Sequence, residues 1–591
     1  MNIYRTFAFA VALTLACLSL VFAADNVLST GADSRLSQKV DFDAEVARVV
    51  DALDSLTLRT GVSLTAGVDN NDWMARDRKV TLHVKGITLC DLMEEIASTL
   101  RFDWTKSGVG TETVYALVQT GKQAAEEQSL RNSAQDANAK LFRQRRENVL
   151  ADMANLGSLS KTDAAKLANS DPWRYVLASE PIGRDLADFF NSFSDARNAF
   201  LQGTQLSFPA SSLPPDLQST VRRIAESYDS LQQRIGASDD HSDLLVKFDK
   251  LQVTINRKLA SGASNLLTES LLGGINVGLE SESIYVPVFD PASAMARALG
   301  RAIVRLQSGL SKEEVGKQLE AELKFETDAQ QSASSSGRDI TSDPSLKKKI
   351  ALHGSDTVAL MTSTLKLLAE KTGLNVISDS FPTKPATMPG GEKTLGEQLE
   401  SIRSAYGSNW EKSGNTVRFR DSEWFVKRTW DVPQVWIDYW TARGKANNGL
   451  FLEDLVQIAE LRDAQIDNTI ATSSALMGLG ADMAVHNREI LRFYASLTYE
   501  QQKTMATDQL NASALSDNQW AMLRSALAIN GSIYTAAEKG SQYIRLTQSG
   551  KDMIEYKFDY YAGPSNQPVE FKLTTGSIYG IADPNTFPTG N

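Results

Sequence analysis

Cysteine, histidine and catalytic signatures are scarce in this 591-residue chain. Two cysteines, Cys17 and Cys90, are too few for a disulfide framework. The four histidines lie far apart in the sequence, and we interpret them as surface or boundary residues. The chain has no His-Glu-x-x-His motif, no phosphate-binding loop and no Gly-x-Ser-x-Gly turn. The sequence therefore offers no catalytic residue, no metal ligand set and no cofactor site, and we expect a protein that is not an enzyme.

The composition is that of a globular protein, with 42% hydrophobic and 23% charged residues. Its net charge of −11 and pI of about 5.2 argue against a dedicated nucleic-acid binder, which needs a clustered positive surface. At about 100–200 residues per domain, the length indicates several domains.

The N-terminus has the pattern of a secretory signal peptide, residues 1–23. Arg5 is the only charged residue before Asp25, an apolar run follows, and the run ends in Val21-Phe22-Ala23. We expect cleavage after Ala23 and export to the periplasm, the cell envelope or the medium. A transmembrane anchor and a lipoprotein signal ending at Cys17 are the alternatives. No later segment reaches the roughly 18 uninterrupted apolar residues of a second span.

Short segments recur in the same order in the two halves of the chain. The run FDWTKSG at 102–108 matches SNWEKSG at 408–414, and RTGV at 59–62 matches KTGL at 371–374. Further matches pair 150–156 with 452–458, 189–194 with 493–498, and 283–285 with 577–579. Chance similarity of amphipathic segments would not keep this order. We therefore interpret the chain as two diverged copies of one unit of about 300 residues.

The front of the first copy alternates helices and strands. Apolar residues at spacings of three and four predict a helix over 43–59, which ends at Thr60-Gly61. Polar and apolar residues alternate from Lys79 to Lys85, as in a half-buried strand. Thr88 is a suitable cap for a Leu-rich helix, and residues 102–118 predict a closing hairpin.

These residues resemble the secretin/TonB short N-terminal (STN) domain, which is also the first periplasmic (N0) domain of secretins. The resemblance rests on Thr60-Gly61, on VTLHVKGITL at 80–89 and on FDWTKSG at 102–108. The second copy, at about 355–420, keeps Thr372-Gly373, Thr394-Leu395 and Trp410 but has Pro382-Thr383-Lys384-Pro385 and Pro389-Gly390-Gly391 where a middle strand is expected. The resemblance implies a small α/β interaction domain, and we expect the edge of the strand with Val80, Leu82 and Val84 to accept a partner strand.

The expected fold class is α+β, with two tandem diverged copies of a unit made of an STN-like domain, a helical segment and terminal β-strands. The expected order is the signal peptide (1–23), an STN-like domain (41–119), a helical region (120–240), β-strands with an amphipathic helix (241–325), a flexible Ser- and Asp-rich linker (326–350), a second STN-like domain (351–421), a second helical region (422–537) and terminal strands (538–591). Candidate terminal strands lie at 244–248, 252–255, 553–561 and 569–573.

Four tryptophans, Trp424, Trp430, Trp436 and Trp440, lie close together in the sequence. They favour a buried aromatic stripe, and the alternative is a stacking platform for sugar rings. The sequence as a whole favours a non-catalytic protein-binding or scaffolding role in the bacterial cell envelope, with another envelope protein as partner and no nucleic acid. The alternatives are a glycan-binding or glycan-processing protein that uses the Trp424–Trp440 region, and an accessory subunit of a secretin-type secretion or pilus machine.

Overall fold

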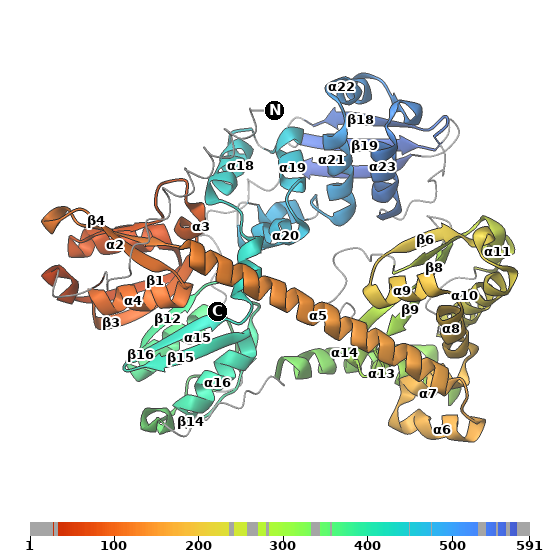
Figure 1. Ribbon diagram of the computed structural model, residues 1–591, viewed down its shortest axis with the longest axis horizontal. Coiled ribbons are helices and arrows are strands. Elements are labelled where there is room, and N and C mark those ends of the chain that lie inside the picture. The colour runs from red at the N-terminus through yellow and green to blue at the C-terminus, as the bar shows by residue number, and fades with distance from the viewer. Residues whose placement is uncertain are drawn as a thin grey trace, which may run out of the picture. The chain divides into compact units, whose positions relative to one another are not determined.

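The computed structural model describes Leu28 and the ranges 33–235, 241–256, 270–278, 283–332, 343–354, 357–447, 449–473, 476–480, 482–529, 539–550, 554–562 and 568–575. Helices and several small sheets are mixed along these ranges, which confirms the α+β class (Figure 1). The expected signal peptide lies outside the described residues. In the part of the chain that is described, no helix has both the length and the apolarity to cross a bilayer.

The chain forms two compact units, each built from two separate stretches of sequence. Unit 1 combines Met1–Gln128 with Ser335–Trp424, and unit 2 combines Ser129–Ser334 with Phe425–Asn591. The first and second halves of the chain therefore do not fold as two separate bodies, because each unit takes one stretch from each half.

The first α/β segment of unit 1, residues 33–118, has the predicted helix only from Val49 on. Residues 43–48, expected to be helical, belong to strand β1, which pairs antiparallel with β3. Gly61 ends α2 with φ 68°, and its N–H donates to the Thr57 carbonyl. The Thr88 hydroxyl accepts from the N–H of Asp91 at the start of α4. Both predicted caps are thus confirmed. The elements are η1 (Ser34–Ser37), β1 (Lys39–Arg48), α2 (Val49–Thr60), β2 (Ser63–Ala66), α3 (Trp73–Arg76), β3 (Lys79–Thr88), α4 (Leu89–Leu100), β4 (Asp103–Ser107), η2 (Gly110–Glu112) and β5 (Val114–Val118).

The second α/β segment, residues 343–421, repeats this order. In both segments the strand after the first helix, β2 or β12, pairs in parallel with the last strand, β5 or β16. The last strand pairs antiparallel with the strand before it, β4 or β15. The strand order β2-β5-β4 thus corresponds to β12-β16-β15. The elements are η5 (Pro344–Lys347), β10 (Lys349–Ile350), β11 (Thr357–Ala359), α15 (Met361–Thr372), β12 (Asn375–Asp379), β13 (Ala386–Met388), β14 (Lys393–Thr394), α16 (Leu395–Tyr406), β15 (Ser408–Ser413) and β16 (Thr416–Asp421).

The middle strand that the sequence did not show in the second segment is present but interrupted. Where the first segment has the long pair β1 and β3, the second has two short pairs, β11 with β13 and β10 with β14. Pro385 and Pro389 flank β13 on either side. A proline has no N–H to donate to a strand ladder, which shortens the strand between them.

The two α/β segments share one sheet. Strand β3 of the first pairs antiparallel with β12 of the second, which gives the strand order β1-β3-β12-β16-β15 (Figure 1). Leu82 lies opposite Ile377 in this pairing, and the Ile377 side chain is buried in the apolar core of the first segment. The shared sheet explains why residues so distant in the chain belong to one compact unit.

Trp104 and Trp410 take matching places in the two segments. Each lies on the strand after the second helix, opposite Leu117 and Phe419 respectively. Both indoles are buried. The indole N–H of Trp104 donates to the Met93 carbonyl of α4 at 2.8 Å, and that of Trp410 donates to Glu400 Oε1 of α16 at 2.9 Å.

Each stretch of unit 2 contains helices and an antiparallel four-stranded sheet with its strands in chain order. The elements from the long helix to the second unit 1 stretch are α5 (Gly121–Leu156), α6 (Lys161–Ser170), α7 (Pro172–Ser179), α8 (Pro181–Ser192), α9 (Ser194–Gln202), β6 (Leu206–Pro209), η3 (Ala210–Ser212), α10 (Pro215–Ile235), α11 (Ser242–Val246), η4 (Phe248–Lys250), β7 (Gln252–Ile255), β8 (Leu271–Gly278), β9 (Ser283–Phe289), α13 (Ala294–Gln307) and α14 (Lys312–Ser332).

The last part of the chain has its own core and sheet. Its elements are α17 (Trp424–Lys427), η6 (Arg428–Trp430), α18 (Gln434–Asn447), α19 (Leu452–Ala459), α20 (Asp463–Thr472), η7 (Met477–Gly480), α21 (Val485–Ser496), α22 (Tyr499–Thr507), β17 (Leu510–Asn511), η8 (Ala512–Ala514), α23 (Asp517–Ile529), β18 (Tyr543–Ser549), β19 (Ile554–Tyr561) and β20 (Val569–Thr575). In both four-stranded sheets a 3-10 turn, η3 or η8, follows the first strand directly. The first N–H of each turn donates to the carbonyl of the residue just before the second strand. The two bonds, from Ala210 to Leu251 and from Ala512 to Gln542, are both 2.8 Å long.

Other expectations also differ from the structure. Residues 244–248 are not a strand, because α11 covers Ser242–Val246 and a 3-10 turn follows. The described ends of the expected linker 326–350 are structured, since α14 continues to Ser332 and the second α/β segment already begins at η5. Near the C-terminal end of this range, Asp343 caps the 3-10 turn η5 by accepting the N–H of Ser345, so Ser and Asp serve here as turn residues.

Because the two segments share a sheet, we expect the Trp104→Ala and Trp410→Ala substitutions each to destabilise all of unit 1. Loss of a buried indole costs about 3–5 kcal/mol. Hydrogen exchange followed by mass spectrometry should show faster exchange in α4 and in α16 for either variant. Trp436→Ala, which removes an exposed indole from unit 2, is the control. An effect confined to the mutated segment would contradict a cooperative unit.

Candidate functional site

Strand β3, expected from the sequence to offer a free edge, is an inner strand of the sheet. β1 pairs with one of its edges and β12 with the other. Val80, Leu82 and Val84 are buried in the core of the first segment. The expectation that these residues bind a strand of another protein is therefore wrong for this structure, because the chain itself supplies the added strand.

Polar contacts hold the two segments together on either side of this strand pair. The Thr81 and Ser380 hydroxyls are 2.8 Å apart, and the backbone N–H of Lys85 donates to Asn375 Oδ1 at 2.8 Å. The backbone N–H of Ser380 donates to the Lys79 carbonyl at 2.9 Å, which extends the ladder past the end of β12.

Two arginines of β16 reach the C-terminal end of α4. Arg420 Nε donates to the Thr99 carbonyl at 2.8 Å, and the same guanidinium also donates to the Ser98 carbonyl. Arg418 lies 3.2 Å from the Glu95 carboxylate. Carbonyls at a helix C-terminus lack intrahelical donors and carry partial negative charge, so cations are favoured there. Burial lowers the pKa of Arg420 and raises the pKa of Glu95.

A side-chain difference distinguishes β12, which receives an added strand, from its counterpart β2, which does not. The Thr57 hydroxyl accepts from the Leu64 N–H at 2.9 Å and donates to the Leu64 carbonyl at 3.3 Å, so both groups of this edge residue are satisfied. The matching position in the second segment is Ala369, which has no hydroxyl. There Val376, the counterpart of Leu64, lies opposite His83 of β3 instead.

The cross-segment pairing also buries a histidine. Alternation along β3 directs Thr81, His83 and Lys85 to the face opposite the Val80–Val84 core, and α15 packs against this strand. The His83 side chain is only 4% exposed, so its interpretation as a surface or boundary residue is wrong. Its burial could not be read from the sequence, because the covering helix lies far away in the chain.

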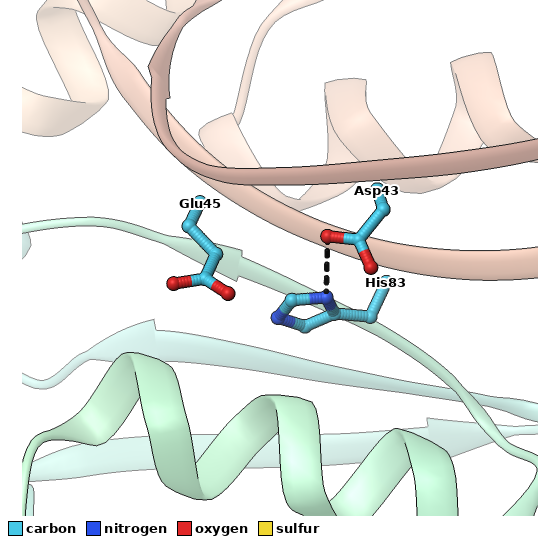
Figure 2. Close-up of side chains that lie close together, drawn as sticks. All are labelled: Asp43, Glu45 and His83. Carbon is cyan, nitrogen blue, oxygen red and sulfur yellow. Dashed lines mark ion pairs between the residues drawn. The ribbon is translucent and has the colours of Figure 1, made fainter.

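Two carboxylates of β1 lie beside this imidazole, as Figure 2 shows. Asp43 is directly opposite His83 in the strand pair, and Asp43 Oδ1 is 3.2 Å from His83 Nδ1. Glu45 follows two residues later, and one donor atom from each of the three residues lies within 4.8 Å of the others. Neither ring nitrogen of His83 makes a hydrogen bond with the described residues.

A cleft of about 340 Å³ opens beside this cluster and is lined by residues of both segments. Lys366 of α15 lies in its wall, and the Lys366 ammonium is 3.1 Å from Glu45 Oε1. Hydrogen bonding to Glu45, with further attraction from Asp43, raises the pKa of Lys366. Other charged groups in the wall are Asp41, Arg59, Lys85 and Glu370. The cleft thus brings together acidic, basic and imidazole side chains.

The backbone next to Glu45 is strained. Val46 has φ 50°, a conformation that is unfavourable for a β-branched residue, and it lies in a bulge between Ala44 and Ala47. The Thr81 hydroxyl accepts the Val46 N–H at 3.1 Å and so holds the bulge in place. The bulge changes the direction of β1 at Glu45, the end of the cluster that contacts Lys366.

The four tryptophans do not form one surface. Trp424 and Trp440 are buried, and Trp430 is half-buried. Trp436 of α18 is 47% exposed, and its ring lies edge-on to that of the exposed Tyr439, with centroids 6.1 Å apart. Burial is thus found for Trp424 and Trp440, which belong to different units, and the expected buried stripe along one helix face is not formed, because Trp436 and Tyr439 of α18 are exposed.

Comparison of the chain with models of protein families, with curated proteins and with solved structures found no match.

We expect Val46→Gly to stabilise unit 1 by about 1 kcal/mol. Glycine relieves a backbone strain of about 1–3 kcal/mol and costs about 0.5–1 kcal/mol in chain entropy. Val68→Gly is the matched control, since Val68 is also exposed but has no positive φ, and it should destabilise slightly. The measurement is the free energy of opening of unit 1 from hydrogen exchange. A destabilising effect of Val46→Gly that equals the control would show that the bulge stores no strain.

Proposed function

We propose that this chain is an exported, non-catalytic binding and scaffolding protein of the cell envelope, built on two STN-like domains of common origin. The observation that carries the proposal is the pairing of β3 with β12. An STN-like domain is expected to bind by strand addition, and here one such domain receives a strand from the other.

The shared architecture of the two α/β segments supports a common origin. Both begin with a 3-10 turn capped by an aspartate, Asp33 or Asp343, and carry a buried leucine in that turn, Leu36 or Leu346. The first N–H of α4 and that of α16 each donate to the carbonyl of the residue just before the first strand, from Leu89 to Gln38 and from Leu395 to Lys348. The matching turns beside the two four-stranded sheets extend the likeness into unit 2.

The way the chain is connected supports the proposed scaffolding role. Residues 129–334 leave unit 1 after the first α/β segment, and residues 425–591 leave it after the second. Pairing of β3 with β12 therefore joins the two α/β segments from which residues 129–334 and residues 425–591 continue. Since the strand edge at Val80–Val84 is occupied, we assign binding of another envelope protein to surfaces other than this strand.

Cleavage of the chain between the two segments tests the scaffold. In a variant with a specific protease site inserted after Gly337, the two fragments should stay together in size-exclusion chromatography. The shared sheet and the Arg420 contacts hold them in unit 1, and unit 2 also takes one stretch from each fragment. The double variant Arg418→Ala/Arg420→Ala should release more of the fragments, whereas Arg76→Ala, at the end of α3, should not. Complete separation of the wild-type fragments would overturn the proposal.

Export is tested by processing of the N-terminus. The mature protein should begin at Ala24, as read by N-terminal sequencing of the envelope fraction. Leu13→Arg, which places a charge in the apolar run, should block processing. Cys17→Ser should leave it unchanged, since the lipoprotein alternative requires that cysteine. A mature protein that retains Met1 would contradict a cleaved signal peptide.

Two alternative proposals use the same exported chain. The exposed pair Trp436 and Tyr439 favours glycan binding, which sedimentation with cell-wall glycan and the Trp436→Ala variant would detect, with exposed Tyr499→Ala as the control. An accessory role in a secretin-type secretion or pilus machine rests on the STN resemblance, and specific co-purification with the secretin would support it.

A further inference from the structure

We propose that Asp43, Glu45 and His83 form a binding site for a divalent transition-metal ion of the Zn²⁺ type. This inference goes beyond the scaffolding role and does not depend on it. The ion would sit where the face of the β1–β3 pair meets α15, at the cleft lined by both segments.

The first argument is the unsatisfied imidazole. Buried polar atoms in folded proteins almost always have a partner, and each exception calls for an explanation such as an unseen water or ion. His83 is 5% exposed, and both of its ring nitrogens are shielded from solvent without a hydrogen bond among the described residues. In Figure 2 the imidazole lies beside both carboxylates, below that of Asp43 and to the right of that of Glu45, so a nitrogen lone pair can point into the acidic cluster.

The second argument is the spacing of the donor atoms. Ligands bound to zinc at about 2.0–2.2 Å lie about 3.0–3.5 Å apart around the ion. His83 Nδ1 and Asp43 Oδ1 are 3.2 Å apart, and the contact does not have the geometry of a hydrogen bond. The three donor atoms, one from each residue, are within 4.8 Å of one another, so a small closure would bring Glu45 to the same ion.

The third argument is that a cation is already drawn to this cluster. The Lys366 ammonium lies 3.1 Å from Glu45, and it is supplied by α15 rather than by the strands that carry the acids. The acids of β1 attract this ammonium, and a divalent ion would be attracted more strongly at the same place. Lys366 is therefore a competitor of the metal, with a side chain long enough to move aside.

The donor set selects the class of metal. One imidazole and two carboxylates suit zinc and similar divalent ions, whereas calcium prefers oxygen ligands alone and copper(I) prefers sulfur. Three protein ligands leave a coordination position open, as in sites where zinc holds a water or a small ligand. Arg59 and Lys85 in the cleft wall would favour a ligand with negative charge at that position.

The test uses the full-length mature protein, stripped of metal with a chelator. Calorimetry with Zn²⁺ should show one equivalent bound, and Co²⁺ should give a visible absorption band from the coordinated ion. Asp43→Asn and Glu45→Gln each replace a solvent-exposed side chain, so the fold is retained, and each should weaken binding by about tenfold or more. Glu370→Gln, which removes another acid of the cleft wall, should change the affinity less than twofold.

Lys366→Gln separates a metal site from a simple ion pair. If the ammonium competes with the metal, this variant should bind Zn²⁺ several-fold more tightly than the wild type. Absence of stoichiometric Zn²⁺ and Co²⁺ binding, or binding that is unchanged in Asp43→Asn and Glu45→Gln, would overturn the proposal. Chromatography of the cleaved chain is independent of these substitutions, so the two proposals can fail separately.

Discussion

The backbone pairing of β3 with β12 is the interaction on which the rest of unit 1 depends. It joins a strand that precedes α4 to one that follows α15, and it completes a five-stranded sheet that neither segment forms alone. The arginine contacts to the end of α4, the burial of Ile377 in the first core and the cover that α15 gives to His83 all follow from it.

Side chains at the edges of β2 and β13 disfavour pairing of these strands with a further strand. A long open edge invites further strands and hence aggregation, and proteins usually block such edges. On β2 the Thr57 hydroxyl satisfies both backbone groups of Leu64. On β13 the flanking prolines leave only three residues of strand. The two segments have similar folds, yet these differences make the contact between them asymmetric.

The same contact creates the chemical environment of the candidate metal site. Without the second segment, the face of β3 with His83 would lie in water, and its imidazole would find water as a hydrogen-bond partner. With α15 in place the His83 imidazole is shielded from solvent, and Glu45 of β1 lies next to Lys366. A cleft remains beside these residues. A role in structure and a role in ligand binding can therefore share one surface.

The sequence alone determined the local features of this protein. Alternation from Lys79 to Lys85 set the inward face of β3, Gly61 and Thr88 set helix ends, and the recurring Trp104 and Trp410 marked equivalent strands, because helix periods, strand periods and caps depend on neighbouring residues. Only the tertiary structure decided that β3 is an inner strand, that residues 43–48 belong to β1 and not to a helix, that residues 244–248 do not form a strand and that His83 is buried. Strand pairing uses backbone groups that every residue but proline carries, so no side-chain pattern in β3 shows that its partner is β12. The burial of a polar residue depends on which helix covers it, and that helix is set by contacts between distant parts of the chain.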